Sequence, residues 1–163
     1  NMFETMYGSR GVGLAAPQIG KALRLFIIDG SPFAEDEAEN EEEKKENEFL
    51  KTFKRVFINP IIEEETGEEW GFEEGCLSIP GIREEVFRQD KVVISYYNEK
   101  WELVEEELTG LAARVVQHEY DHIEAKLFTD YLSPLKKRLI KRKLTDISKG
   151  IVPVDYKMKF IKK

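Results

Sequence analysis

The amino-acid sequence predicts an α+β fold from two observations. Segments with the alternation or β-branched content of strands follow one another in the middle of the chain, at residues 53–62, 86–88, 92–97 and 103–108. Helical patterns flank this run, one before it at residues 1–7 and two after it. Strands in a run with helices on either side are typical of α+β proteins. The length of 163 residues suits one domain with a sizeable core.

The chain begins inside a predicted helix, which has Phe3 and Met6 on its apolar face. Its first residue is Asn1 rather than methionine, so we expect further sequence upstream of this fragment or processed form. A glycine-rich loop follows at residues 11–18. The apolar residues 23–29 then predict a buried strand.

Residues 31–48 differ in character from the rest of the chain. Glu and Asp dominate this segment, which has two lysines and few apolar residues. Such a composition buries too little apolar surface to order a segment. We therefore expect a mobile acidic surface insertion that lies away from the functional motifs, with a functional acidic element as the alternative.

Several turns are predicted between the strands. Asn59-Pro60 indicates a turn or a strand edge, because proline cannot donate a hydrogen bond within a sheet. Pro80-Gly81 indicates that the chain turns. Residues 98–100 are typical of a hairpin turn between two antiparallel strands.

Two helices are predicted in the second half of the chain. Thr109 is a suitable N-cap for a helix over residues 110–125. A basic, exposed helix over residues 135–149 is expected to begin after Ser133 and to end at Gly150.

Composition excludes several classes of protein. The net charge of −7 disfavours general nucleic-acid binding. The single cysteine rules out an intramolecular disulfide framework and fits a reducing compartment. No apolar run approaches the roughly 18 residues of a membrane span, and no signal peptide is recognisable.

Both histidines of the chain lie in one stretch, His118-Glu119-Tyr120-Asp121-His122. Residues four apart share a helix face, so His118 and His122 can hold one cation between them. Glu119 beside them can serve as a base without being a ligand. A chance match on a solvated helix face is the alternative. Apolar residues at helical spacing around the motif argue against it, because they predict a largely buried helix.

The single cysteine lies in a second motif, Glu74-Gly75-Cys76-Leu77-Ser78. One thiolate and two imidazoles would provide three protein ligands and leave a fourth position for water, as catalytic sites require. Most single cysteines are small buried apolar residues. The coincidence of the two motifs, rather than Cys76 alone, therefore indicates a metal site.

Three segments of the chain resemble the signature motifs of the peptide deformylases. Residues 11–18 match G-x-G-L-A-A-x-Q, residues 74–78 match E-G-C-x-S, and residues 117–122 match Q-H-E-x-D-H. The motifs occur in the family's order and at family-like spacing. The resemblance continues through residues 127–135 and covers most of the chain except the acidic insertion.

The resemblance implies antiparallel β-sheets packed around a central metal-binding helix. It also implies a single catalytic domain over residues 1–163, from which the N-terminal part of the family domain is missing. The acidic insertion at residues 31–48 is unusually long for the family. Ala125 stands where the family usually has a glycine, which concerns only the geometry of the helix end.

A metal site and its chemistry follow from the resemblance. Cys76, His118 and His122 would bind one divalent ion, with Fe²⁺ expected in the cell and Ni²⁺, Co²⁺ or Zn²⁺ as possible replacements. Spacing alone does not choose among these metals. The bound metal would lower the pKa of water toward ~7 and so supply hydroxide at neutral pH.

Catalytic roles are implied for three further positions. Glu119 would take the proton of the water and deliver it to the leaving amine. The side-chain amide of Gln18 and the backbone N–H of Leu77 would stabilise the oxyanion. Asp121 would hold the geometry near the ligands, with an ion pair to Arg88 as a hypothesis.

The resemblance also implies how the substrate is bound. The matching positions are Gly11, Val12, Gly13, Phe72, Leu111, Arg114 and Val115. The two glycines would let the backbone approach the substrate closely. The apolar side chains would form a pocket for the methionine side chain, with the arginine at its rim.

The expected activity is removal of the N-formyl group from N-formylmethionyl nascent peptides. The bacterial cytoplasm is the expected location, and an organelle is the alternative. The basic helix over residues 135–149 could contact ribosomal RNA, although a solvated helix face is the simpler interpretation.

Two other functions are compatible with parts of the sequence. A zinc endopeptidase of the H-E-x-x-H type would need a third ligand, yet no third histidine exists and Glu124 lies close along the same helix. A metal-binding module without activity should have lost Glu119, Gln18 or Cys76, and all three are present.

Overall fold

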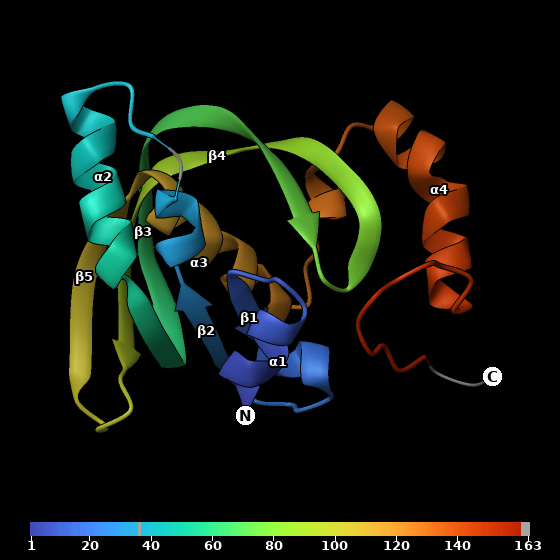
Figure 1. Cartoon of the computed structure of the whole chain (residues 1–163), viewed down its shortest axis with the longest axis horizontal. Helices are drawn as coiled ribbons and strands as arrows, with labels where there is room; N and C mark the ends of the chain where they lie inside the picture. Colours follow the sequence, from blue (N-terminus) through green and yellow to red (C-terminus); the bar gives the residue numbers. More distant parts are fainter. Residues whose placement is uncertain (36, 161–163) are drawn as a thin grey trace.

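The computed structural model describes residues 1–35 and 37–160 and has an α+β architecture (Figure 1). The elements in chain order are α1 (Met2–Gly8), β1 (Gly13–Ala15), η1 (Ala16–Ile19), β2 (Leu25–Asp29), η2 (Ser31–Ala34), α2 (Glu41–Thr52), β3 (Lys54–Cys76), β4 (Ile79–Tyr97), β5 (Leu103–Thr109), α3 (Gly110–Ile123), η3 (Phe128–Tyr131) and α4 (Pro134–Ser148). The five strands pair antiparallel in sequence order. The predicted fold class is confirmed.

The strands of the described residues form one continuous sheet rather than several. Strands β3 and β4 are 23 and 19 residues long, and they arch over α3 in Figure 1. Their register shifts several times, so the pair bends without breaking into separate sheets. One shift lies at Asn59-Pro60, where Asn59 adopts φ 49°. The turn predicted there is therefore a bulge within β3.

The turn between β3 and β4 lies at Leu77-Ser78, not at Pro80-Gly81 as predicted. Pro80 and Gly81 belong to β4, although Gly81 adopts a positive φ of 72°, a value common in turns. The predicted hairpin turn after β4 is confirmed, with the Trp101 N–H donating to the Asn98 carbonyl at 3.0 Å. The predicted glycine-rich loop at residues 11–18 contains the short strand β1 and most of η1.

Helix α3 is the central element, and the sheet encloses it. It contacts β1, β2, β4 and β5, and most of its residues are buried, as its apolar spacing predicted. The core between helix and sheet includes Phe26, Phe57, Val92, Ile94, Leu108, Ala113 and Val116. Burying so many apolar side chains against one helix fixes its rotation and depth. The side chains of α3 that face the end of β3 are thereby held in place.

The prediction of a mobile acidic loop over residues 31–48 is wrong, because much of this segment is ordered. Helix α2 begins after Asn40, whose side chain accepts from the N–H groups of Glu42 and Glu43. The acidic residues in its first turn stabilise the helix, because their negative charge lies at the positive end of the helix dipole. Leu50, just beyond the acidic stretch, is buried in the core and anchors the helix. Within the segment itself, Ala34 is also buried in this core and Phe33 packs against it.

Helix α2 also caps α3. The Glu46 carboxylate accepts from the Leu111 N–H at 2.8 Å. Thr109 occupies the predicted N-cap position of α3, but its side chain makes no capping bond. The acidic segment therefore touches the metal helix rather than lying apart from the motifs, because Glu46 satisfies an N–H group that the helix start leaves free.

Helix α4 begins and ends as predicted, with the Ser133 hydroxyl accepting from the Lys136 N–H at 3.3 Å and Gly150 at φ 76° after its end. It is exposed except on one face, where Ile140 and Ile147 pack against β4 and η3. The chain then returns as an irregular segment toward the N-terminal elements (Figure 1). None of the helices in the described residues is both long and apolar enough to cross a membrane.

Candidate metal centre and active site

Three potential metal ligands meet where the end of β3 faces α3. One ligand atom each of Cys76, His118 and His122 lies within 4.8 Å of the others. The Cys76 sulfur is 3.3 Å from His122 Nε2, and the two imidazole rings are 5.0 Å apart between centroids. The end of a strand and one turn of a helix thus bring together residues 42 and 46 positions apart in sequence.

The charges at this cluster fit a cation. Burial lowers the pKa of His118, but hydrogen bonds to Cys76 and Glu74 and the charge of Glu119 outweigh it and raise that pKa to about 10. Burial, together with the positive charges of His118 and Arg88, lowers the pKa of His122 to about 3. Without a metal the site therefore holds a proton on one imidazole and leaves the other neutral. A divalent ion on one thiolate and two neutral imidazoles would supply the positive charge that these surroundings favour.

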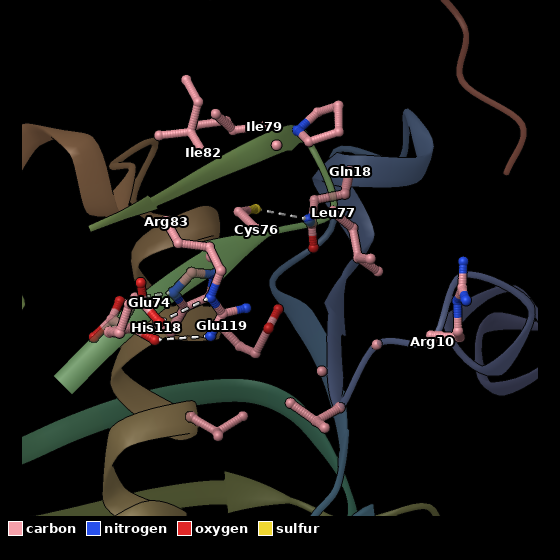
Figure 2. Close-up of a pocket in the computed structure, with 18 of the residues that line it drawn as sticks. Arg10, Gln18, Glu74, Cys76, Leu77, Ile79, Ile82, Arg83, His118 and Glu119 are labelled. Carbon is pink, nitrogen blue, oxygen red and sulfur yellow. Dashed lines mark hydrogen bonds and ion pairs between the residues drawn. The ribbon is translucent and has the colours of Figure 1, made fainter. Parts of the chain in front are cut away.

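The Glu74 carboxylate, on β3, binds the side chains of three residues around the ligand cluster. Its side chain is 4% exposed and accepts from His118 Nδ1 at 3.0 Å, which leaves His118 Nε2 for a metal (Figure 2). It also accepts from Arg88 Nε at 2.7 Å and from Arg114 Nη1 at 3.0 Å. Burial alone would raise the pKa of Glu74, but bonds from His118 and Arg88 lower it to about 2.

The predicted ion pair between Arg88 and Asp121 is confirmed at 2.8 Å. Asp121 also accepts from the Tyr131 hydroxyl at 2.9 Å. Arg88 therefore joins Asp121 on the metal helix to Glu74 on β3, and all three side chains are buried. This ionic network fixes β3, β4 and α3 around the ligands.

Glu119 is a buried carboxylate beside the ligands. Its side chain is 4% exposed, and its Oε2 is a buried atom without a hydrogen-bond partner among the described residues. Burial raises its pKa to about 7, opposed by the charge of His118. A Cβ on Gly13 would lie 2.4 Å from Glu119 Oε1, so only glycine leaves room for this carboxylate. The orphaned oxygen is available to a water or substrate atom at the ligands.

Gln18 lies against the turn that contains Leu77. Gln18 Oε1 accepts from the Ala15 N–H at 2.8 Å, which orients its amide. Its Nε2 donates to the Ser78 hydroxyl at 3.0 Å. The same nitrogen lies 3.5 Å from the Cys76 sulfur (Figure 2). The Leu77 side chain lies against Gly11, since a Cβ there would be 2.7 Å from Leu77 Cδ1.

A cleft of about 790 Å³ opens over these residues. Of the residues predicted to contact substrate, its lining includes Gly11, Val12, Gly13, Phe72, Arg114 and Val115. Leu111 is the exception, because it lies one turn further from the ligands and lines a separate groove with Glu46. Arg114 is buried at the floor rather than at a rim and donates to Glu74 and to the carbonyls of Val86 and Trp70.

The chain is similar to known proteins. A family model described as polypeptide deformylase matches residues 1–138. The peptide deformylase of Christiangramia forsetii is 62% identical over 160 residues, which are 98% of this chain and 80% of that protein. The chain belongs to the peptide deformylase family. It is a metallohydrolase of protein biosynthesis that removes the N-formyl group from nascent peptides.

Solved peptide deformylases have the same fold. The crystal structure from Legionella pneumophila is 41% identical with a TM-score of 0.70, covering 91% of this chain and 78% of that one. A Plasmodium falciparum peptide deformylase is 34% identical with a TM-score of 0.75, again covering 91% and 78%. The likeness extends well beyond the three motifs.

Two parts of the deformylase site were not predicted from the sequence. Glu74 was quoted only as part of the cysteine motif and was given no role. Its position two residues before Cys76 could have suggested that it hydrogen-bonds to a metal ligand. The C-terminal segment was not assigned any role, yet Pro153, Val154, Asp155 and Tyr156 line the cleft. No sequence pattern marks this segment, because its contacts depend on the tertiary path of the chain after α4.

Proposed function

We propose that Cys76, His118 and His122 bind the divalent metal of this deformylase and that Glu119 carries the proton. The observation that supports this most strongly is the unpartnered, buried Glu119 oxygen beside the three ligand atoms. When bound, a divalent ion acidifies water and polarises the formyl carbonyl. Glu119, with a pKa of about 7 in the metal-free protein, is poised to accept a proton near neutral pH.

The side chains and the backbone of the protein carry out the remaining steps. As the water oxygen adds to the formyl carbon, Gln18 Nε2 and the Leu77 N–H donate to the oxyanion. The Gln18 amide has two N–H donors. One bonds to Ser78, and the other, which donates to the Cys76 sulfur at 3.5 Å, would turn from the sulfur to the substrate oxyanion. Glu119 then delivers its proton to the methionine nitrogen as the C–N bond breaks. The products are formate and a free amino terminus.

The methionine side chain of the substrate is proposed to lie against Val12, Phe72 and Val115, which line the cleft. Gly11 and Gly13 keep the neighbouring wall free of side chains, so the peptide backbone can approach it. Arg114 supports this wall from below through its bonds to Trp70 and Val86. Leu111 lines the neighbouring groove with Phe72 and is proposed to contribute to substrate binding from there.

Fe²⁺ is the proposed metal in the cell, with Ni²⁺, Co²⁺ or Zn²⁺ able to replace it. A thiolate with two imidazoles is a donor set that these ions share. Elemental analysis of protein purified without oxygen tests this proposal, and zinc as the dominant metal would contradict it.

The wider setting is also a proposal. Residues 1–163 are proposed to act as a single catalytic domain in the bacterial cytoplasm, since the relatives from Christiangramia forsetii and Flavobacterium johnsoniae are bacterial. The exposed basic face of α4 is a proposed contact with the ribosome, close to emerging formylated chains. Salt-dependent co-sedimentation with ribosomes tests this contact.

Incubation with a formyl-Met-Ala peptide distinguishes deformylation from peptide cleavage. We expect formate and an intact dipeptide with a free amine, seen by mass spectrometry. Cleavage of internal peptide bonds would favour an endopeptidase. Against that activity, Glu124 is not part of the ligand cluster found among the described residues and instead pairs with Arg24 at 2.6 Å.

A further inference from the structure

The C-terminal segment after α4 is attached to the catalytic cleft at several points. Val152 packs against the cluster formed by β4, η3 and α4. Asp155 pairs with Arg10, and both residues line the cleft. The Tyr156 hydroxyl donates to the Leu77 carbonyl at 2.8 Å. Figure 1 shows the red segment running back from α4 toward the blue N-terminal elements.

These attachments differ in strength. Arg10 and Asp155 are 76% and 65% exposed, so their ion pair is screened by water and holds the segment weakly. The Tyr156 hydroxyl is partly buried and bonds to backbone at the β3–β4 turn. The family model ends at residue 138, so this contact lies in a part of the chain that the model does not cover.

The turn that Tyr156 contacts carries one proposed oxyanion donor, Leu77, and binds the other, Gln18 of η1. Leu77 supplies its own N–H, and Ser78 accepts from the Gln18 amide at 3.0 Å. Leu77 is held on its other side by the close approach of Gly11. The pairing of Cys76 with Ile79 closes this two-residue turn, and the Tyr156 hydroxyl adds a bond to it from outside the hairpin.

We propose that Tyr156 is a positioning residue for deformylation, which holds the Leu77-Ser78 turn so that the two oxyanion donors keep their geometry. This inference rests on the proposed roles of Gln18 and Leu77. Donors that strengthen toward the transition state raise kcat, whereas uniform binding of the substrate changes KM. Loss of the hydroxyl should therefore reduce kcat and leave KM nearly unchanged.

The test compares Tyr156→Phe with Tyr97→Phe in the metal-loaded enzyme, using a formyl-Met-Ala peptide. Tyr97 lies at the far end of β4 and is 38% exposed, so it controls for the same chemical change away from the cleft. We expect Tyr156→Phe to lower kcat about two- to tenfold, the range that loss of one neutral hydrogen bond allows. Tyr97→Phe should stay at the parental value.

A second readout does not depend on turnover. Hydrogen–deuterium exchange of a peptide spanning the β3–β4 turn should be faster in metal-free Tyr156→Phe than in the parent or in Tyr97→Phe. Parental kcat in Tyr156→Phe, or a raised KM with kcat unchanged, would overturn the positioning role. A parent enzyme without deformylase activity would instead refute the proposed function, so the two failures can be told apart.

Discussion

Glu74→Gln is the substitution that most directly probes how the fold supports the metal ligands. It removes the buried charge that Arg88, Arg114 and His118 share. In the metal-free protein the pKa of Glu74 falls from 4.5 to about 2. That shift corresponds to about 3 kcal/mol of folding free energy at neutral pH. Breaking a buried ion pair on one side costs about 3–5 kcal/mol, which agrees.

The pH dependence of this difference has a definite sign. A carboxyl whose pKa is lower in the folded state stabilises the fold above its unfolded pKa, near 4.5. This stabilisation is lost as the pH falls from there toward about 2. The difference in the free energy of unfolding between the parent and Glu74→Gln should thus have its full value at pH 7 and be smaller at pH 3.

Urea unfolding of the metal-free proteins measures this gap, with Glu73→Gln as the matched control. Glu73 is the neighbouring residue, is 67% exposed and pairs with Arg83 at the surface, so its loss should cost at most about 1 kcal/mol. Glu74→Gln should also weaken metal binding about 10- to 100-fold, because His118 loses its hydrogen-bond partner. A gap no larger than that of the control, or one that stays constant down to pH 3, would refute the reasoning.

Three further predictions concern the ligands and α2. Cys76→Ser should reduce metal affinity and activity together, since a neutral hydroxyl replaces a thiolate, as metal titration and turnover will show. Glu46→Ala should lower the free energy of unfolding by about 1 kcal/mol through loss of the cap on α3, whereas the exposed Glu48→Ala should not. The affinity with which the protein binds its metal should rise between pH 6 and 8. The pKa of His118 is about 10 without metal, so metal binding must displace a proton, and each displaced proton makes the affinity change about tenfold per pH unit. A chelator competition series that is flat over this range would contradict it.

Local patterns in the sequence were sufficient to predict the histidine-bearing helix and much of the fold. His118 and His122 lie four apart in an apolar helix, so their shared face follows from helix geometry alone. The meeting of that helix with Cys76 followed from the resemblance to a family, because no local pattern reports the distance between segments so far apart.

Tertiary context explains what was missed. Residues 31–48 looked unable to fold, but α2 is ordered by Leu50, which follows the acidic stretch, and by the contact of Glu46 with the start of α3. Pro80 and Gly81 suggested a turn, yet pairing between β3 and β4 places them inside a strand. Residues after α4 carry no pattern, and only the folded chain brings Tyr156 to Leu77.

Turnover and metal content of Glu119→Ala test the central claim most directly. Glu119 is proposed as the proton carrier and not as a ligand, so the variant should keep its metal while formate release from a formyl-Met peptide falls at least about 100-fold. Metal is measured by elemental analysis in the same sample. Turnover near the parental rate, or loss of the metal together with activity, would contradict the assignment.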